Sequence, residues 1–202
     1  MARYMRHADR ARFAASHAAL RLILGRALGL DPRALAFTLA PGGRPELEGR
    51  ALSFNLSHSG ERALVALSGE APVGVDVETL RPMPDALRIA RGHFAADEVA
   101  ALARLDGQAR EAAFFALWTR KEAVVKALGA GLALPLADFS VSLPPGPPRL
   151  LRMAAGVQGG SGPWSLHHLE PGPGTVGALA AIGPVPGLAC RALAPDWPAL
   201  LP

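Results

Sequence analysis

The chain has 202 residues, of which half are hydrophobic, and carries 21 Lys and Arg against 17 Asp and Glu for a formal charge of +4. This length suits one ordinary domain or two small halves sharing a core, and the mild basic excess fits an anionic ligand or an acidic protein rather than nucleic acid. Cys190 is the only cysteine, which excludes an internal disulfide, and since no signal peptide or membrane-length apolar run is visible, we expect a cytoplasmic protein without membrane contact.

The first part of the chain predicts one helix followed by strands. Residues 9–28 have apolar residues at helical spacing, from Phe13 to Leu28, and Gly29 is a plausible stop. Residues 34–39 predict a short strand, and residues 41–45 (PGGRP) predict a turn. Arg44 in this turn could meet a phosphate, although a single Gly-Gly-Arg is weak support.

A polar cluster ends the next predicted strand. Residues 52–56 alternate apolar and polar side chains, and Ser57 and His58 follow before a further strand at 63–67. Side chains at a strand end are well placed to bind a ligand, but the same residues also make ordinary turns. No nucleophile motif surrounds Ser57, which disfavours a serine hydrolase.

Residues 73–78 (VGVDVE) predict a strand with two acids on one face. The three valines face one side, so Asp76 and Glu78 project together from the other. Neighbouring carboxylates repel each other unless a cation lies between them, and a hard divalent ion prefers oxygen ligands. A solvated strand face is the alternative.

The most unusual segment is a long apolar helix, predicted at 112–128, that contains charges. Lys121, Glu122 and Lys126 interrupt a run of Ala, Leu, Val and Phe, and Trp118, Glu122 and Lys126 recur every four residues on one face. A simple ion pair one turn apart would explain this pattern. A metal ligand beside a phosphate-binding lysine is the other reading, and both stay open at this point, although this helix alone favours the ion pair.

The remaining elements indicate an α+β fold. Residues 86–91 and 96–105 predict helices, with Asp97 and Glu98 as first-turn acids, residues 132–136 an extended segment, and residues 139–143, 164–169 and 175–182 strands. This order predicts two similar α+β halves, an N-terminal half at 1–72 and a C-terminal half at 73–183, followed by a tail at 184–202.

Together the motifs resemble the 4′-phosphopantetheinyl transferase superfamily. The resemblance rests on residues 73–78 (VGVDVE) and 118–126 (WTRKEAVVK), with 43–45 (GRP) and 54–60 (FNLSHSG) similar to upstream motifs of the long, Sfp-type branch. Residues 132–136 (LALPL) and 139–141 (FSV) resemble the segment after that branch's catalytic helix. The resemblance implies a fold of two halves in a pseudo-twofold arrangement.

The resemblance also implies a reaction. Members of this family move the 4′-phosphopantetheine arm of coenzyme A to a serine of an apo acyl or peptidyl carrier protein and release adenosine 3′,5′-bisphosphate. By the same resemblance, Asp76, Glu78 and Glu122 would hold Mg²⁺, and Glu122, Lys126 and Lys121 would be catalytic, with Glu122 the candidate base. The implied coenzyme-binding residues are Arg44, Ser57, His58, Asp76 and Lys126, while Asn55 is expected to support the strand end instead.

One departure from the family pattern leads to a further expectation. The usual first strand with its basic residues is absent before the helix at 9–28, so we expect an incomplete N-terminal half with an unpaired strand edge and weak coenzyme affinity, which Arg3, Arg6 and Arg10 could offset in part. We expect a monomer. A non-catalytic binding module and an unrelated Mg²⁺-dependent phosphohydrolase are the alternatives.

Overall fold

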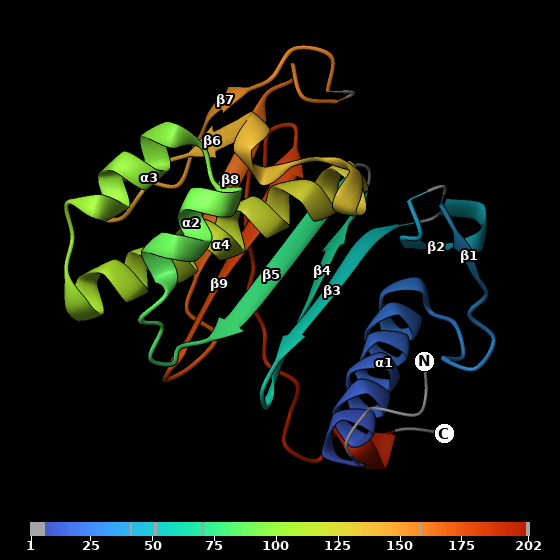
Figure 1. Ribbon diagram of the computed structural model, residues 1–202. Coiled ribbons are helices and arrows are strands. Elements are labelled where there is room, and N and C mark those ends of the chain that lie inside the picture. The colour runs from blue at the N-terminus through green and yellow to red at the C-terminus, as the bar shows by residue number, and fades with distance from the viewer. Residues whose placement is uncertain (1–6, 41, 51, 70, 158, 201–202) are drawn as a thin grey trace.

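The computed structural model describes residues 7–40, 42–50, 52–69, 71–157 and 159–200. Helices and antiparallel strands are mixed along the chain, which confirms the predicted α+β class (Figure 1). The described elements are α1 (His7–Leu28), β1 (Phe37–Leu39), β2 (Pro45–Leu47), β3 (Ser53–Ser59), β4 (Arg62–Ser68), β5 (Val73–Thr79), α2 (Ala86–His93), α3 (Ala96–Ala103), α4 (Gly107–Leu128), β6 (Phe139–Val141), β7 (Leu150–Met153), β8 (Trp164–Leu169) and β9 (Thr175–Ile182). Short 3-10 helices lie at η1 (Glu48–Arg50), η2 (Gly131–Ala133), η3 (Leu136–Asp138) and η4 (Trp197–Leu200).

A three-stranded antiparallel sheet carries α4 on one face. Its order is β5-β9-β8, and the register places Asp76 opposite Ala178. Ala178 and Ala180 of β9 share the largest apolar cluster with Val124 of α4, so small side chains let the helix lie close to the sheet. Because side chains alternate across a strand, Asp76 faces the helix with them.

The β3–β4 hairpin covers the other face of this sheet. Leu64 and Ala66 of β4 pack against Val75 and Leu179 in a separate buried cluster. Within the described residues β3 and β4 form a two-stranded sheet and pair only with each other. On its outer side β3 packs with α1, in a smaller core that contains Leu24. The two predicted halves therefore share one apolar contact layer rather than lying apart.

Several element boundaries differ from the predictions. Helix α4 begins at Gly107 instead of 112, because Arg110 pairs with Asp106 at 2.8 Å and supports a polar first turn that an apolar pattern misses. Residues 132–136 are not one extended segment, since η2 and η3 interrupt them. Phe13, predicted in the buried stripe of α1, is 48% exposed.

Two short strands were not predicted, because each is defined by its partner. Strand β2 covers part of the expected turn and pairs with β1, and β7 pairs with β6. Segments of three or four residues show too little periodicity for prediction. The C-terminal tail runs back to the N-terminal part of the molecule, where η4 lies beside α1 (Figure 1).

Candidate active site

The site is built where β5 and α4 approach most closely. Gly74 permits this contact, since a Cβ atom at this position would lie 2.1 Å from the carbonyl oxygen of Ala123 and 2.3 Å from the amide nitrogen of Ala127. Any larger residue would push the helix away from the strand. Asp76 and Glu78 follow at two-residue intervals on the same face, so both carboxylates are presented to the helix.

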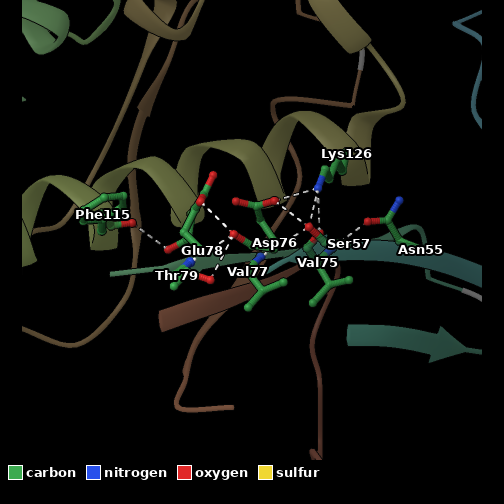
Figure 2. A network of polar contacts seen from close by, with 11 residues as sticks. Asn55, Ser57, Val75, Asp76, Val77, Glu78, Thr79, Phe115 and Lys126 are labelled. Atoms are coloured by element: carbon green, nitrogen blue, oxygen red, sulfur yellow. Dashed lines mark hydrogen bonds and ion pairs between the residues drawn. The ribbon is translucent and has the colours of Figure 1, made fainter. Parts of the chain in front are cut away.

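Asp76 is the buried centre of the cluster, with 6% of its surface exposed. Its Oδ1 accepts hydrogen bonds from Lys126 Nζ at 2.7 Å and from Ser57 Oγ at 2.8 Å (Figure 2). Its Oδ2 is buried and has no hydrogen-bond partner among the described residues. Burial raises the pKa of Asp76, and Lys126 opposes this shift. One carboxylate oxygen of Asp76 thus accepts two hydrogen bonds, while the other has no partner among the described residues.

Glu122 and Glu78 complete a group of three acids. Burial raises the pKa of Glu122, and the negative charges of Asp76 and Glu78 raise it further, whereas Lys126 lowers it. Glu122 lies one helical turn before Lys126, so it is on the face of α4 that contacts Asp76. Glu78 Oε2 accepts a hydrogen bond from Ser59 Oγ at 3.1 Å and lies 3.5 Å from Arg81 Nη1.

The donor chemistry of this group fits a divalent cation. Asp76, Glu78 and Glu122 supply only carboxylate oxygens, the ligands that Mg²⁺ prefers, and the bare Asp76 Oδ2 is an unsatisfied buried acceptor. As placed, however, no three His, Cys, Asp or Glu side chains in the part of the chain described here are close enough to hold an ion. To bind a cation, the Glu122 side chain would have to rotate toward the two strand acids, since Asp76 and Glu78 are each held by a serine of β3.

Lys126 of α4 contacts residues of both β3 and β5. Its Nζ contacts Asp76, Ser57 Oγ at 3.0 Å and the carbonyl oxygen of Val75 at 3.2 Å. The structure therefore brings together Ser57, Asp76 and Lys126, three of the residues predicted from sequence, in one contact network (Figure 2).

Lys121 does not join this cluster. Its side chain is 0% exposed, and its Nζ lies 2.7 and 2.9 Å from the two carboxylate oxygens of Glu98 and 2.6 Å from the carbonyl oxygen of Phe139. The ammonium group is thus turned toward α3 and β6 rather than toward β5. This position does not support the predicted catalytic role for Lys121 and assigns it to holding α4 in place. Glu98, predicted only as a first-turn acid, is its buried partner.

Arg44 lies at the C-terminal end of α4. Its guanidinium donates to the carbonyl oxygens of Lys126 at 3.4 Å and Ala127 at 3.2 Å, and pairs with Glu46 at 2.9 Å. Helix α4 ends at Gly129 with φ of 67°, and a cation is favourable beside the free carbonyl groups of a helix end. The predicted phosphate contact of Arg44 thus competes with contacts inside the protein.

His58 and Ser57 point in opposite directions, because adjacent residues of a strand do so. Ser57 faces the acid cluster, while His58 lines a cavity of about 430 Å³ between α1 and β3. His17 and Arg21 of α1 line the same cavity with Phe37 and Phe54. The two residues, predicted as one coenzyme-binding pair, therefore belong to two neighbouring sites. Arg3 and Arg6 lie outside the described residues.

The sequence did not reveal the role of Ser59, and Asn55, expected to support a strand end, instead lies within β3 and contacts β5. The side-chain oxygens of Asn55, Ser57 and Ser59 accept hydrogen bonds from the backbone amides of Val75, Val77 and Thr79 at 2.9, 3.3 and 3.1 Å. Three alternate side chains of β3 thereby pair with the backbone of β5. Each of these β3 side chains lies 20 residues before its partner amide in β5. This constant spacing is the sequence signal that could have predicted the pairing.

Comparisons with known proteins agree on one family. The family model described as the 4′-phosphopantetheinyl transferase superfamily matches residues 72–179. A putative 4′-phosphopantetheinyl transferase of Synechocystis is 43% identical over 134 residues, which are 65% of this chain and 54% of that protein. The 4′-phosphopantetheinyl transferase HetI of Nostoc is 37% identical over 86% of this chain and 72% of its own length. The 4′-phosphopantetheinyl transferase Sfp of Bacillus subtilis is 34% identical over 61% of this chain, and the chain spans about half the length of Sfp and of the Synechocystis protein.

Proposed function

Because the chain belongs to the 4′-phosphopantetheinyl transferase superfamily, we propose that it transfers the 4′-phosphopantetheine arm of coenzyme A to a serine of an apo carrier protein and releases adenosine 3′,5′-bisphosphate. In this reaction the serine oxygen bonds to the phosphorus that carries the pantetheine, and the bridging bond from that phosphorus to the adenosine phosphate breaks. The convergence of Asp76, Glu78, Glu122 and Lys126 between β5 and α4 carries the proposal.

The three carboxylates would hold Mg²⁺, which supplies stabilisation of the negative charge that develops on the leaving phosphate. Lys126 would exchange its contact with Asp76 for the coenzyme's phosphates, since its side chain is 27% exposed and can reach a ligand. Its charge would then orient the pyrophosphate for attack.

Glu122 is the residue best suited to accept the serine proton. Its pKa is raised, mainly by burial and then by Asp76 and Glu78, and a more basic carboxylate is a better proton acceptor when ionised. The Glu122 side chain makes no hydrogen bond to the rest of the described chain and is half-buried, so its oxygens are free to face a substrate.

The cavity beside His58 would receive the adenosine end of the coenzyme. Apolar walls of Phe37 and Phe54 suit a base, and Arg21, His17 and His58 suit a phosphate. Arg21 is already held by the carbonyl oxygens of Pro32 and Leu35 and lies 4.9 Å from the Phe37 ring centre, so the cationic wall is preorganised.

The carrier protein would be acidic, in keeping with the chain's +4 charge. No helix of the described residues is both long and apolar enough to cross a membrane. A cytoplasmic monomer remains our prediction.

A transfer assay tests the proposal and separates the alternatives. Coenzyme A, Mg²⁺ and an apo carrier protein are incubated with the chain, and a mass gain of one phosphopantetheine arm on the carrier is expected. A binding module would bind coenzyme A without any mass gain, and a phosphohydrolase would cleave coenzyme A without the carrier.

The Glu122→Gln variant provides the internal control. Loss of a general base typically lowers kcat by about 10²–10⁴-fold, while coenzyme A binding measured by calorimetry should persist. Transfer at the parent rate by this variant would contradict the proposed role of Glu122.

A further inference from the structure

Two serines of β3 each hold one acid of the candidate metal site. Ser57 Oγ donates to Asp76 Oδ1 at 2.8 Å, and Ser59 Oγ donates to Glu78 Oε2 at 3.1 Å. The two pairs have the same sequence separation of 19 residues and lie two residues apart on neighbouring strands. They therefore form one repeated arrangement rather than two unrelated contacts.

Each serine also has its hydroxyl direction set by the backbone of β5. Ser57 Oγ accepts from the amide of Val77 at 3.3 Å, and Ser59 Oγ accepts from the amide of Thr79 at 3.1 Å. An oxygen that accepts from an amide must direct its own proton elsewhere. For both serines the carboxylate oxygen is the nearest acceptor, and for Ser59 the hydroxyl of Thr79 is a more distant one at 3.4 Å. The strand register thus fixes which carboxylate oxygen is bound.

In both acids the serine occupies one oxygen and leaves the other without a partner. Asp76 Oδ2 is buried and bare, and Glu78 Oε1 makes no hydrogen bond within the described part of the chain. We propose that Ser59, together with Ser57, is a positioning residue that presents one free oxygen of each acid to the divalent ion. This inference rests on the proposed function for the presence of the ion. Hydrogen bonds to metal-ligating side chains set their orientation and, with it, the affinity for the metal.

A second side chain, Arg81, also approaches the Glu78 oxygen that Ser59 binds. Arg81 Nη1 lies 3.5 Å from the same Glu78 Oε2 and is largely exposed. Without the Ser59 hydroxyl, Glu78 would be left to Arg81, whose Nη1 also donates to the carbonyl oxygen of Thr79 at 3.2 Å. The expected consequence is weaker metal binding and an unchanged fold, because Ser59 is only part-buried.

The experiment measures Mn²⁺ binding by electron paramagnetic resonance, with coenzyme A present and no carrier protein. Ser59→Ala is expected to weaken Mn²⁺ binding by about 10-fold, at the lower end of the range for such partners. Ser53→Ala is the matched control, since Ser53 lies on the same face of β3 and its hydroxyl bonds no described residue. Ser59→Thr should bind Mn²⁺ as the parent does, and Ser59→Val, its isostere without the hydroxyl, as Ser59→Ala does.

The outcomes separate this inference from the proposed function. Unchanged Mn²⁺ affinity in Ser59→Ala and Ser59→Val, equal weakening in Ser53→Ala, or a parent chain that binds no Mn²⁺ would each overturn it. In a Glu78→Gln background, Ser59→Ala should cause no additional loss, and a full additional loss would also overturn it. A parent that binds Mn²⁺ but modifies no carrier would refute the proposed transferase and leave the role of Ser59 intact.

Discussion

Glu122 is a carboxyl group whose surroundings oppose its ionisation. Burial raises its pKa, and the charges of Asp76 and Glu78 raise it further. An acid with a folded pKa above its unfolded value of about 4.3 destabilises the fold at pH values above the folded pKa. This penalty declines as the pH falls through the folded pKa and is absent below the unfolded one. Ionised Glu122, the proposed base, should therefore lower the free energy of unfolding.

We expect Glu122→Gln to raise the melting temperature of the metal-free protein at neutral pH. Glutamine mimics the protonated acid, so the gain over the parent should shrink on acidification and disappear below a pH of about 4. Scanning calorimetry across this pH range gives the difference directly. Glu48→Gln, at an exposed glutamate, serves as the control and should show no such pH-dependent gain. A Glu122→Gln protein less stable than the parent at neutral pH would contradict the expectation.

At the scale of elements, the buried pair of Glu98 and Lys121 connects three segments. Glu98 accepts from the amides of Ala95 and Val141 at 3.0 and 2.8 Å, in addition to Lys121. Lys121 in turn donates to the carbonyl oxygen of Phe139. One carboxylate thus joins the start of α3, strand β6 and α4, which fixes the rotation of α4 and hence the face that carries Glu122.

Removing either partner should therefore be costly. Lys121→Met or Glu98→Gln is expected to lower the free energy of unfolding by about 3–5 kcal/mol each, since either change leaves a buried charge unpaired. The double variant should lose much less than the sum of the two, because both charges are removed together. Urea denaturation of the four proteins completes the cycle. Additive losses would show that the two groups do not act as a pair.

The same pair shows what a sequence pattern can and cannot predict. Periodicity predicted strand β5, helix α4 and the common face of Glu122 and Lys126, because these depend on neighbours along the chain. It could not predict that Lys121 meets Glu98, since their proximity depends on how α3 packs against α4. Likewise, it did not predict β2, which forms only beside β1. The sequence pattern was therefore sufficient to predict the face of α4 that carries Glu122 and Lys126. The contacts of the opposite face, which carries Lys121, depend on tertiary packing.

At the scale of the whole molecule, the N-terminal elements are bound to the central sheet. Leu64 of β4 contributes to the same buried cluster as Leu179 of β9, while side chains of β3 pair with the backbone of β5. The site itself draws on both parts, because Ser57 comes from β3 and Asp76 from β5. The two predicted halves therefore meet in this shared cluster and both contribute to the site, although each also has an apolar cluster of its own.

This shared layer predicts a single cooperative unfolding transition. Trp118 reports on α4, and Trp197 in η4 reports on the region beside α1 (Figure 1). In variants that keep either Trp118 or Trp197 as the single one of the chain's three tryptophans, the urea midpoints followed by fluorescence should coincide. Leu179→Ala should lower the free energy of unfolding by about 2–5 kcal/mol. Both urea midpoints should therefore fall by the same amount. The exposed Leu188→Ala is the control and should leave both midpoints in place. If the Trp197 midpoint comes at lower urea and is unchanged by Leu179→Ala, the two parts unfold separately. The contacts of Ser57 and Ser59 with β5 would then be too weak to link them.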